Sequence, residues 1–291
     1  MAETITPSIR RILGPNPSPM TFTGTNTYLL GRREIAVIDP GPDSTDHLSA
    51  ILDAIASDCQ ITKILVTHSH IDHSQLAKTL GQSCGAKIYA YGDSLAGRSA
   101  DMVALAQSGN LGGGEGVDEE FQPDIILPDG AALEHDGAQV TAIWTPGHFG
   151  NHMAFAYEGA LFCGDHVMGW ASSMVSPPDG DLGAFRHSCA RLLARPEIHY
   201  LPGHGEPMTD GPARVRWLLA HRDAREAQIM DALAQQPDTA QGLAERIYTD
   251  VDSHLIPAAI RNVLAHLIDL HTRKRVSAHG VIGLHTKYSA L

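Results

Sequence analysis

The sequence lacks the features that identify membrane, secreted and thiolate-metal proteins. It has no run of roughly 18 or more uninterrupted apolar residues, the length that a membrane-spanning helix needs. The first 19 residues lack the basic-then-apolar order of a secretory signal. Its four cysteines form no CxxC pair, so we expect ordinary buried thiols rather than disulfides or a thiolate zinc site. These absences predict a cytoplasmic protein with no membrane partner.

Basic side chains are also scarce. The chain carries 21 Lys and Arg against 33 Asp and Glu, for a formal net charge of −12 at pH 7. The acidic excess lies in residues 1–209, which hold 11 basic and 24 acidic residues, whereas residues 210–291 hold 10 and 9. Strong nonspecific binding to nucleic acid depends on clustered Lys and Arg. The acidic body therefore disfavours that activity, although bound divalent cations would add positive charge.

Up to about residue 208, short apolar stretches alternate with Gly, Pro and Asp turns. These stretches predict strands at 26–30, 34–39, 63–67, 87–91, 139–144, 152–157, 160–163 and 198–201. Helical spacing of apolar residues predicts helices at about 45–57, 74–80 and 182–194. The glycine-rich stretch at 109–116 lacks the GK[ST] of a phosphate-binding loop, so we expect a flexible loop. The pattern predicts a mixed α/β domain over residues 1–208.

The remaining residues, 209–291, have a helical pattern. A long helix is predicted at 211–235, ending before Pro237, and shorter helices are predicted at 239–248 and 256–274. The stretch 275–288 then predicts a hairpin that turns near Gly280. Three helices followed by a hairpin is the order of a winged-helix domain.

The stretch THSHIDH, residues 67–73, contains four potential metal ligands. His68 and His70 are two positions apart after a strand, so in an extended segment both imidazoles leave the same side and can share one metal ion. Asp72 and His73 fall where the chain turns into a helix, so they would point elsewhere and serve a second ion. Two or three further ligands must then come from distant parts of the chain.

Three later motifs supply such ligands. His148 in TPGH, Asp165 in CGDH and His204 in PGHG each lie just past a predicted strand. Residues on loops at strand ends are commonly functional, because a rigid sheet holds them in place. The neighbouring glycines let the backbone pass close to a bound ion without a clash from a Cβ atom.

The motifs THSHIDH, TPGH, GD and PGHG, in this order and with IDPG at 38–41, resemble those of the metallo-β-lactamase superfamily. The resemblance covers about the first 208 residues. It implies an α/β fold, a four-layer αβ/βα sandwich with the metals at one edge of two packed sheets. It also implies two metal sites that share a bridging, catalytic Asp165. One ion would be bound by His68, His70 and His148, and the other by Asp72, which is also catalytic, His73 and His204.

The segments 14–31 and 164–182, together with the C-terminal part, narrow the resemblance to β-lactamase-like hydrolases that carry a winged helix. That group is related to glyoxalase II, a thioesterase, and to a mitochondrial endoribonuclease that acts on single-stranded RNA. Only 38 positions separate Asp165 from His204, too few for the inserted domain of β-CASP nucleases. The chain also lacks the exosite arm of tRNA 3′-processing enzymes. Because it has no secretory signal, a β-lactam substrate is not expected.

These observations predict a hydrolase in which a hydroxide bridging two metal ions attacks a carbonyl or phosphorus. Metal coordination lowers the pKa of water to about 7, so no Ser or Cys nucleophile is needed. Zinc is favoured by imidazole-rich ligation, with iron or manganese as alternatives. Asp39 could orient a ligand or close its own turn. His152 and His166 could assist proton transfer, although a structural role is favoured for both.

Three functions remain open from the sequence. The first is hydrolysis of a small ester or thioester, which the acidic body favours. The second is single-strand-specific RNA cleavage, for which the basic residues near the last helix and hairpin are candidates: Arg261, Arg273, Lys274, Arg275 and Lys287. The third is a winged-helix regulator without enzymatic activity, which the intact ligand set disfavours. The oligomeric state is not predicted.

Overall fold

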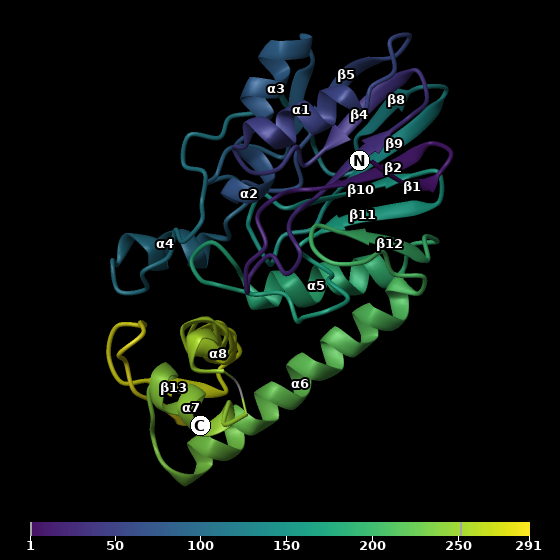
Figure 1. Cartoon of the computed structure of the whole chain (residues 1–291). Coiled ribbons are helices and arrows are strands. Elements are labelled where there is room, and N and C mark those ends of the chain that lie inside the picture. The colour runs from purple at the N-terminus through teal and green to yellow at the C-terminus, as the bar shows by residue number, and fades with distance from the viewer. Residues whose placement is uncertain (1, 251) are drawn as a thin grey trace.

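The computed structural model describes residues 2–250 and 252–291, and two facing β-sheets form the centre of its larger part (Figure 1). The first sheet contains, in spatial order, β1 (Glu3–Thr6), β2 (Ile9–Leu13), β3 (Asn26–Leu30), β4 (Glu34–Ile38), β5 (Gln60–Leu65), β6 (Lys87–Ala90) and β7 (Ile125–Ile126). The second contains β12 (His199–Pro202), β11 (Ala160–Gly164), β10 (Met153–Tyr157), β9 (Ala138–Trp144) and β8 (Ala132–His135).

Helices cover the outer face of each sheet. On the first sheet lie α1 (Thr45–Asp53) and α3 (Ala77–Cys84), and on the second lies α5 (Leu182–Leu193). One apolar cluster, which includes Tyr28, Phe155 and Phe162, fills the space between the sheets. The central strands β3 and β4 of the first sheet are covered on both faces, which explains their nearly continuous apolar sequences. The predicted four-layer α/β sandwich is confirmed.

The predicted strands are all present, with ends that differ by a few residues. The strand predicted at 63–67 begins at Gln60 and ends at Leu65. The helix predicted at 74–80 is two helices, α2 (Ile71–Ser74) and α3. Strands β1, β2, β7 and β8 and helix α4 (Ala100–Gln107) were not predicted. Several of these elements lie at sheet edges, where exposed side chains interrupt the apolar pattern on which the prediction depended.

The C-terminal part has the predicted order of helices and hairpin. It contains α6 (Gly211–Gln235), α7 (Ala240–Ile247), the short helix η1 (Ser253–Leu255), α8 (Ile256–Thr272), β13 (Val276–Ala278) and β14 (Tyr288–Ala290). Its core includes Leu243, Leu264 and Leu267. The predicted hairpin is present, but Ala278 pairs with Tyr288, so its loop spans residues 279–287 and extends well beyond Gly280. No helix in the described ranges is long and apolar enough to cross a membrane.

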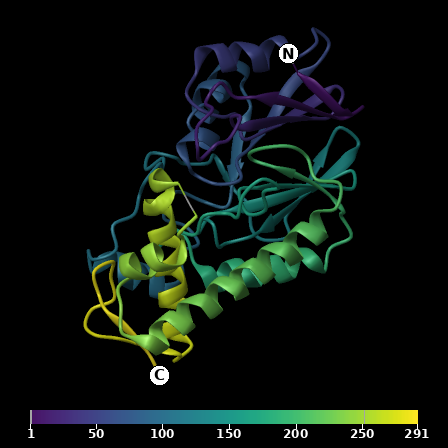
Figure 2. The ribbon, with the colours of Figure 1, turned by 60° about the horizontal axis from the view of Figure 1, so that its bottom comes forward.

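Helix α6 joins the two parts of the molecule (Figures 1 and 2). Asp210 caps its start by accepting a hydrogen bond from Ala213 N, and Pro212 occupies its first turn. Val215 and Leu218, in its first half, pack into the core beneath the second sheet. Ile229 and Leu233, in its second half, belong to the C-terminal core. The same helix therefore contributes to both cores, and the division at 208/209 stays a prediction.

Candidate metal centre

The segment that follows β5 lies where the two sheets meet. Val66 N donates to Tyr89 O in the first sheet, and Met153 N in the second sheet donates to Thr67 O. His70 then begins the turn into α2, where Ile71 N donates to Gly116 O. Within the motif, the backbone therefore passes from an extended segment to a helix. That change gives the first two and the last two candidate ligands different directions.

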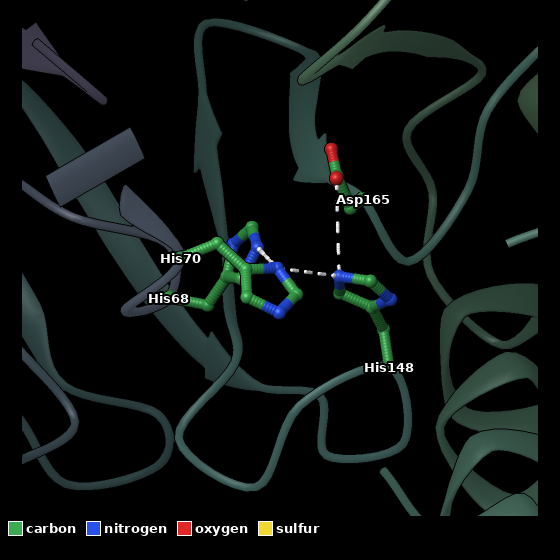
Figure 3. A group of neighbouring side chains, drawn as sticks. All are labelled: His68, His70, His148 and Asp165. Carbon is green, nitrogen blue, oxygen red and sulfur yellow. Dashed lines mark hydrogen bonds and ion pairs between the residues drawn. The ribbon is translucent and has the colours of Figure 1, made fainter. Parts of the chain in front are cut away.

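The first group of side chains contains His68, His70, His148 and Asp165 (Figure 3). His68 Nε2 lies 2.8 Å from His70 Nδ1, and His148 Nε2 lies 3.2 Å from that same atom. The three imidazoles come from two loops, one after β5 and one after β9. Most of their ring nitrogens lie beneath the surface, because His68 and His148 are buried, while His70 is partly exposed.

The second group contains Asp72, His73 and His204. His73 Nε2 lies 3.3 Å from both Asp72 Oδ2 and His204 Nε2. His204 Nε2 lies 3.2 Å from Asp72 Oδ2, which completes a nearly equilateral triangle of ligand atoms. The structure thus brings together all seven side chains that the sequence motifs single out.

Asp165 lies between the two groups. Its Oδ2 is 3.8 Å from His148 Nε2 in the first group and 3.2 Å from His204 Nε2 in the second. Its Oδ1 is 3.5 Å from His73 Nε2. Asp165 lies within reach of the first group, but its shorter contacts are with the second. The carboxylate is therefore within reach of ligand atoms on both sides.

The outer nitrogen of each of four imidazoles has a polar partner. His148 Nδ1 donates to Met174 O at 2.7 Å, and His204 Nδ1 donates to Gly24 O at 3.1 Å. His68 Nδ1 lies 3.0 Å from Thr67 Oγ1, whose own proton goes to a carboxylate. A ring that donates through Nδ1 keeps a lone pair on Nε2 when it is neutral. These contacts therefore direct lone pairs toward the centre.

Asp39 supplies the fourth of these partners. Its Oδ2 lies 2.9 Å from His73 Nδ1 and accepts a hydrogen bond from Thr67 Oγ1 at 2.7 Å. Its Oδ1 accepts from Thr67 N at 2.7 Å. The same residue has a positive φ of 48°, so it also forms the turn after β4. Both roles considered for Asp39 from the sequence are present in the structure.

Charge differs between the two groups. Burial and the neighbouring His148 lower the pKa of His70 to about 3, so its imidazole is neutral at pH 7. Burial also opposes protonation of His204, but Asp165 and Asp72 raise the pKa of that residue to about 9. Without a metal ion, protons therefore balance the carboxylates of the second group. A divalent cation would replace those protons.

The donor set fits divalent metal ions. At the Zn–N distance of 2.0–2.1 Å, two ligand atoms of a tetrahedral site lie about 3.3 Å apart. The three distances in the second group are 3.3, 3.3 and 3.2 Å. If both rings were neutral, the Nε2 lone pairs of His73 and His204 would face each other with no proton between them and would repel each other. A cation between them would remove this repulsion. Imidazoles and carboxylates together suit zinc, iron and manganese.

Glycines next to the ligands have two different uses. A Cβ on Gly203 would lie against Asp165 Oδ1 and 2.7 Å from His73 Cε1, so this glycine makes room for the ligand side chains. A Cβ on Gly147 would instead collide with the backbone of Phe185 in α5. Gly203 therefore allows the backbone to pass close to the candidate ligands, as expected. Gly147 instead allows the backbone to pass close to helix α5.

His152 and His166 lie in the core near the candidate ligands. His152 is fully buried, and its Nδ1 lies 2.8 Å from Thr145 Oγ1. The ring of His166 packs on Phe185, and its Nε2 lies 3.6 Å from Cys189 Sγ. These contacts are those of packing residues, the role that the sequence favoured for both. All four cysteines are free thiols, and Cys163 and Cys189 are buried as expected, whereas Cys59 and Cys84 are only partly buried.

Several residues that contact the candidate ligands were not identified from the sequence. Thr25 Oγ1 donates to Asp72 Oδ2 at 2.8 Å, and the carbonyls of Gly24 and Met174 accept from histidines. Thr67, which contacts His68, is the first residue of the His-rich motif, and that position is the one available signal. The others lie far along the chain, and backbone carbonyls leave no trace in residue identity.

The glycine-rich loop was expected to be flexible, but the structure shows defined contacts for it. Gly114 N donates to Asp179 Oδ2 at 2.9 Å, and Leu111 O accepts from Arg261 of α8. Glu115 lines a small pocket beside the first group, together with His70, His148, Met174, Ser176 and Asp179. The loop therefore forms one wall of the site.

Comparison with known proteins agrees with this geometry. Residues 20–206 match the family described as the Metallo-beta-lactamase superfamily, and residues 239–282 match the Beta-lactamase associated winged helix domain. The Beta-lactamase-like protein 2 homolog of Drosophila melanogaster is 30% identical over 276 residues, which are 91% of this chain and 88% of that protein. The Atrochrysone carboxyl ACP thioesterase of Claviceps purpurea is 30% identical over 256 residues, 84% and 74% of the two chains.

A solved structure extends the similarity over both parts of the molecule. A metallo-beta-lactamase family protein of Thermus thermophilus superposes with a TM-score of 0.78 and 27% identity. The match covers 99% of this chain and 100% of that one. The chain therefore belongs to the metallo-beta-lactamase superfamily of hydrolases and carries the winged helix domain associated with it.

Proposed function

We propose that the protein is a dinuclear metal hydrolase that cleaves a small ester or thioester. One ion would be held by His68, His70 and His148, and the other by Asp72, His73 and His204, with Asp165 as a ligand that both ions could share. Zinc is the proposed metal, and iron or manganese would suit the same ligands. Residues 1–208 form the catalytic domain and residues 209–291 the winged-helix domain. A cytoplasmic location remains part of the proposal, since four free thiols suit a reducing compartment.

The observation that carries the proposal is the position of the Asp165 carboxylate. Its oxygens lie 3.2–3.8 Å from ring nitrogens of both groups. Burial favours the neutral acid, but His204 and His73 hold its pKa well below the ordinary value, so the group is a carboxylate at neutral pH. A buried anion placed between two clusters of lone pairs supports two cations rather than one.

Two bound divalent ions would supply a water nucleophile of lowered pKa and polarise the scissile bond. The protein's own residues hold the ligands in orientation. Asp39 and the carbonyls of Met174 and Gly24 accept the Nδ1 protons of His73, His148 and His204. Outer partners of this kind fix the tautomer and the direction of the ligand lone pair.

An apolar surface beside the second group supports a substrate with an apolar part. Phe22, whose side chain is 48% exposed, stacks on Trp170 with ring centroids 4.9 Å apart. Trp170 packs against Gly205, next to His204, and Phe22 is two residues from Gly24, whose carbonyl contacts that histidine. A relative is named a thioesterase. Both observations favour an acyl ester or thioester.

The structure weakens the case for RNA cleavage, because two of the basic residues considered for RNA binding are engaged within the protein. Arg261 is buried, with 8% of its surface exposed, and bonds to protein carbonyls rather than facing solvent. Arg273 pairs with Asp269 and Glu226 at 2.7 and 2.6 Å. The RNA-binding role considered for Arg261 is therefore not supported. The third candidate, a regulator without activity, requires a degenerate site, whereas the seven side chains converge.

The function is tested with metal-loaded protein on a panel of acyl thioesters and esters, beside a labelled single-stranded RNA. We expect thioester or ester turnover in the wild type and its loss in Asp72→Ala. RNA cleavage that Asp72→Ala abolishes, with no turnover of any ester or thioester, would overturn the proposed substrate class. An absence of both activities in metal-loaded protein would favour the regulator.

A further inference from the structure

Three side chains of the C-terminal helices hold the segment 173–177 beside the candidate metal centre. Arg222 in α6 donates to Ser173 O and, at 2.9 Å, to Asn262 Oδ1. Asn262 Oδ1 also accepts from Val175 N at 3.2 Å. Arg261 Nε donates to Ser176 Oγ at 2.8 Å. We call Arg222, Arg261 and Asn262 the α6–α8 clamp.

The clamp surrounds the residue whose carbonyl contacts a candidate ligand. Within 173–177, the clamp bonds Ser173 O, Val175 N, Ser176 Oγ and Pro177 O. Met174 O bonds to none of the clamp residues and accepts from His148 Nδ1 at 2.7 Å. The partners of the clamp flank this carbonyl on both sides. The clamp therefore fixes the acceptor that orients His148.

Arg261 also joins this segment to the opposite wall of the site. Its guanidinium donates to Pro177 O and to Leu111 O in the glycine-rich loop. Asp179 strengthens the same connection, because it accepts from Gly114 N and pairs with Arg98. The pocket beside His70 and His148 is lined by residues from both segments. One arginine of α8 thus sets the separation of the two walls.

The chemistry of the clamp suits positioning rather than binding a charged partner. Arg222 is 1% exposed and Arg261 is 8% exposed, and every hydrogen bond that either makes to the described residues is to a neutral oxygen. A planar guanidinium offers five donors in a fixed fork, so it can hold several carbonyls at once. Burying an arginine is costly, and the accepting oxygens offset that cost, together with the charges of Glu115 and Asp179 near Arg261.

We propose that the α6–α8 clamp positions His148, so that the C-terminal helices control metal affinity at the first site. The inference rests on the proposed role of His148 as a ligand. The clamp residues act on the site through Met174 O rather than by binding the metal ion themselves. The C-terminal part is accordingly required for a correctly formed metal centre.

The test compares four variants of the full-length protein. Asn262→Leu removes the acceptor for Val175 N at similar volume. Arg261→Gln removes the guanidinium that bonds both Leu111 O and Pro177 O and so joins the two walls of the site. Asn262→Asp keeps an acceptor oxygen and should behave as the wild type. Arg273→Gln is the matched control, because Arg273 lies at the end of the same helix and its side chain bonds Asp269 and Glu226 instead. Thermal unfolding of the metal-free proteins identifies any variant that does not fold.

The readouts are zinc affinity, by competition with a chelating dye, and the visible absorption spectrum of the Co²⁺-loaded proteins. We expect Asn262→Leu and Arg261→Gln to lose about 10–100-fold in affinity for one ion and to change the Co²⁺ spectrum, as loss of an outer partner does. Folded variants with wild-type affinity and spectrum would overturn the positioning role, and either variant suffices if the other fails to fold. A wild type that itself fails to bind two ions would instead contradict the proposed function.

Discussion

Asp39 Oδ2 lies 2.9 Å from Nδ1 of His73, and both groups are buried. The carboxylate accepts the Nδ1 proton, so in the neutral ring that a metal ion requires, the Nε2 lone pair of His73 faces Asp72 and His204. The geometry explains why the first turn after β4 matters for a site formed largely by later parts of the chain.

The first prediction concerns this carboxylate. Asp39→Asn keeps the size of the side chain and tolerates the positive φ. Its amide has only one acceptor oxygen, however, so it cannot accept from both Thr67 and His73 as the two carboxylate oxygens do. We expect a loss of about 10–100-fold in affinity for the second ion, with the protein still folded. Chelator competition measures the affinity, and Asp53→Asn on the exposed end of α1 is the control. Unchanged affinity in Asp39→Asn would show that its contact with His73 is only structural.

The second prediction tests the room made by a glycine. Gly203→Ala would place a Cβ 2.7 Å from His73 Cε1 and against Asp165 Oδ1. We expect metal affinity to fall at least roughly tenfold, because both ligands must move although neither is removed. Gly183→Ala in α5 is the control, since its Cβ meets neighbours only at 3.4 Å, an ordinary contact distance. Equal metal binding by the two variants would contradict the described packing.

The third prediction concerns the apolar surface. Trp170→Ala removes the ring that stacks on Phe22. If acyl groups bind there, KM for apolar acyl thioesters should rise about tenfold, the effect of losing about 1.4 kcal/mol, with a smaller change in kcat. Trp217→Ala is the matched control, because that ring stacks on His221 along α6. A KM that does not depend on Trp170 for any acyl group would remove the apolar surface from the substrate site.

The fourth prediction concerns stability. Metal ions that bind only the folded chain should stabilise it by about 4 kcal/mol per site when the free ion is a thousandfold above Kd. Chelation should therefore lower Tm, while far-ultraviolet circular dichroism stays native below the transition, because the sandwich core does not depend on the ligands. Scanning calorimetry with and without chelator measures the shift. A Tm that is insensitive to metal removal is the contrary result.

The sequence was sufficient to predict the fold and to single out the side chains that converge. Each candidate ligand follows a strand, and sheet geometry brings strand ends to a common edge. Residues joined through tertiary packing could not be predicted. Arg261 was considered for RNA binding, but it is buried because α8 packs against two loops more than 80 positions earlier in the chain. Spacing in the sequence carries no information about such contacts.

The most direct test of the central claim is the metal content of the loaded protein. Elemental analysis after metal loading and removal of excess ions should find about two divalent ions per chain, the number that a shared Asp165 requires. Fewer than about one ion per chain in folded protein would contradict the dinuclear mechanism.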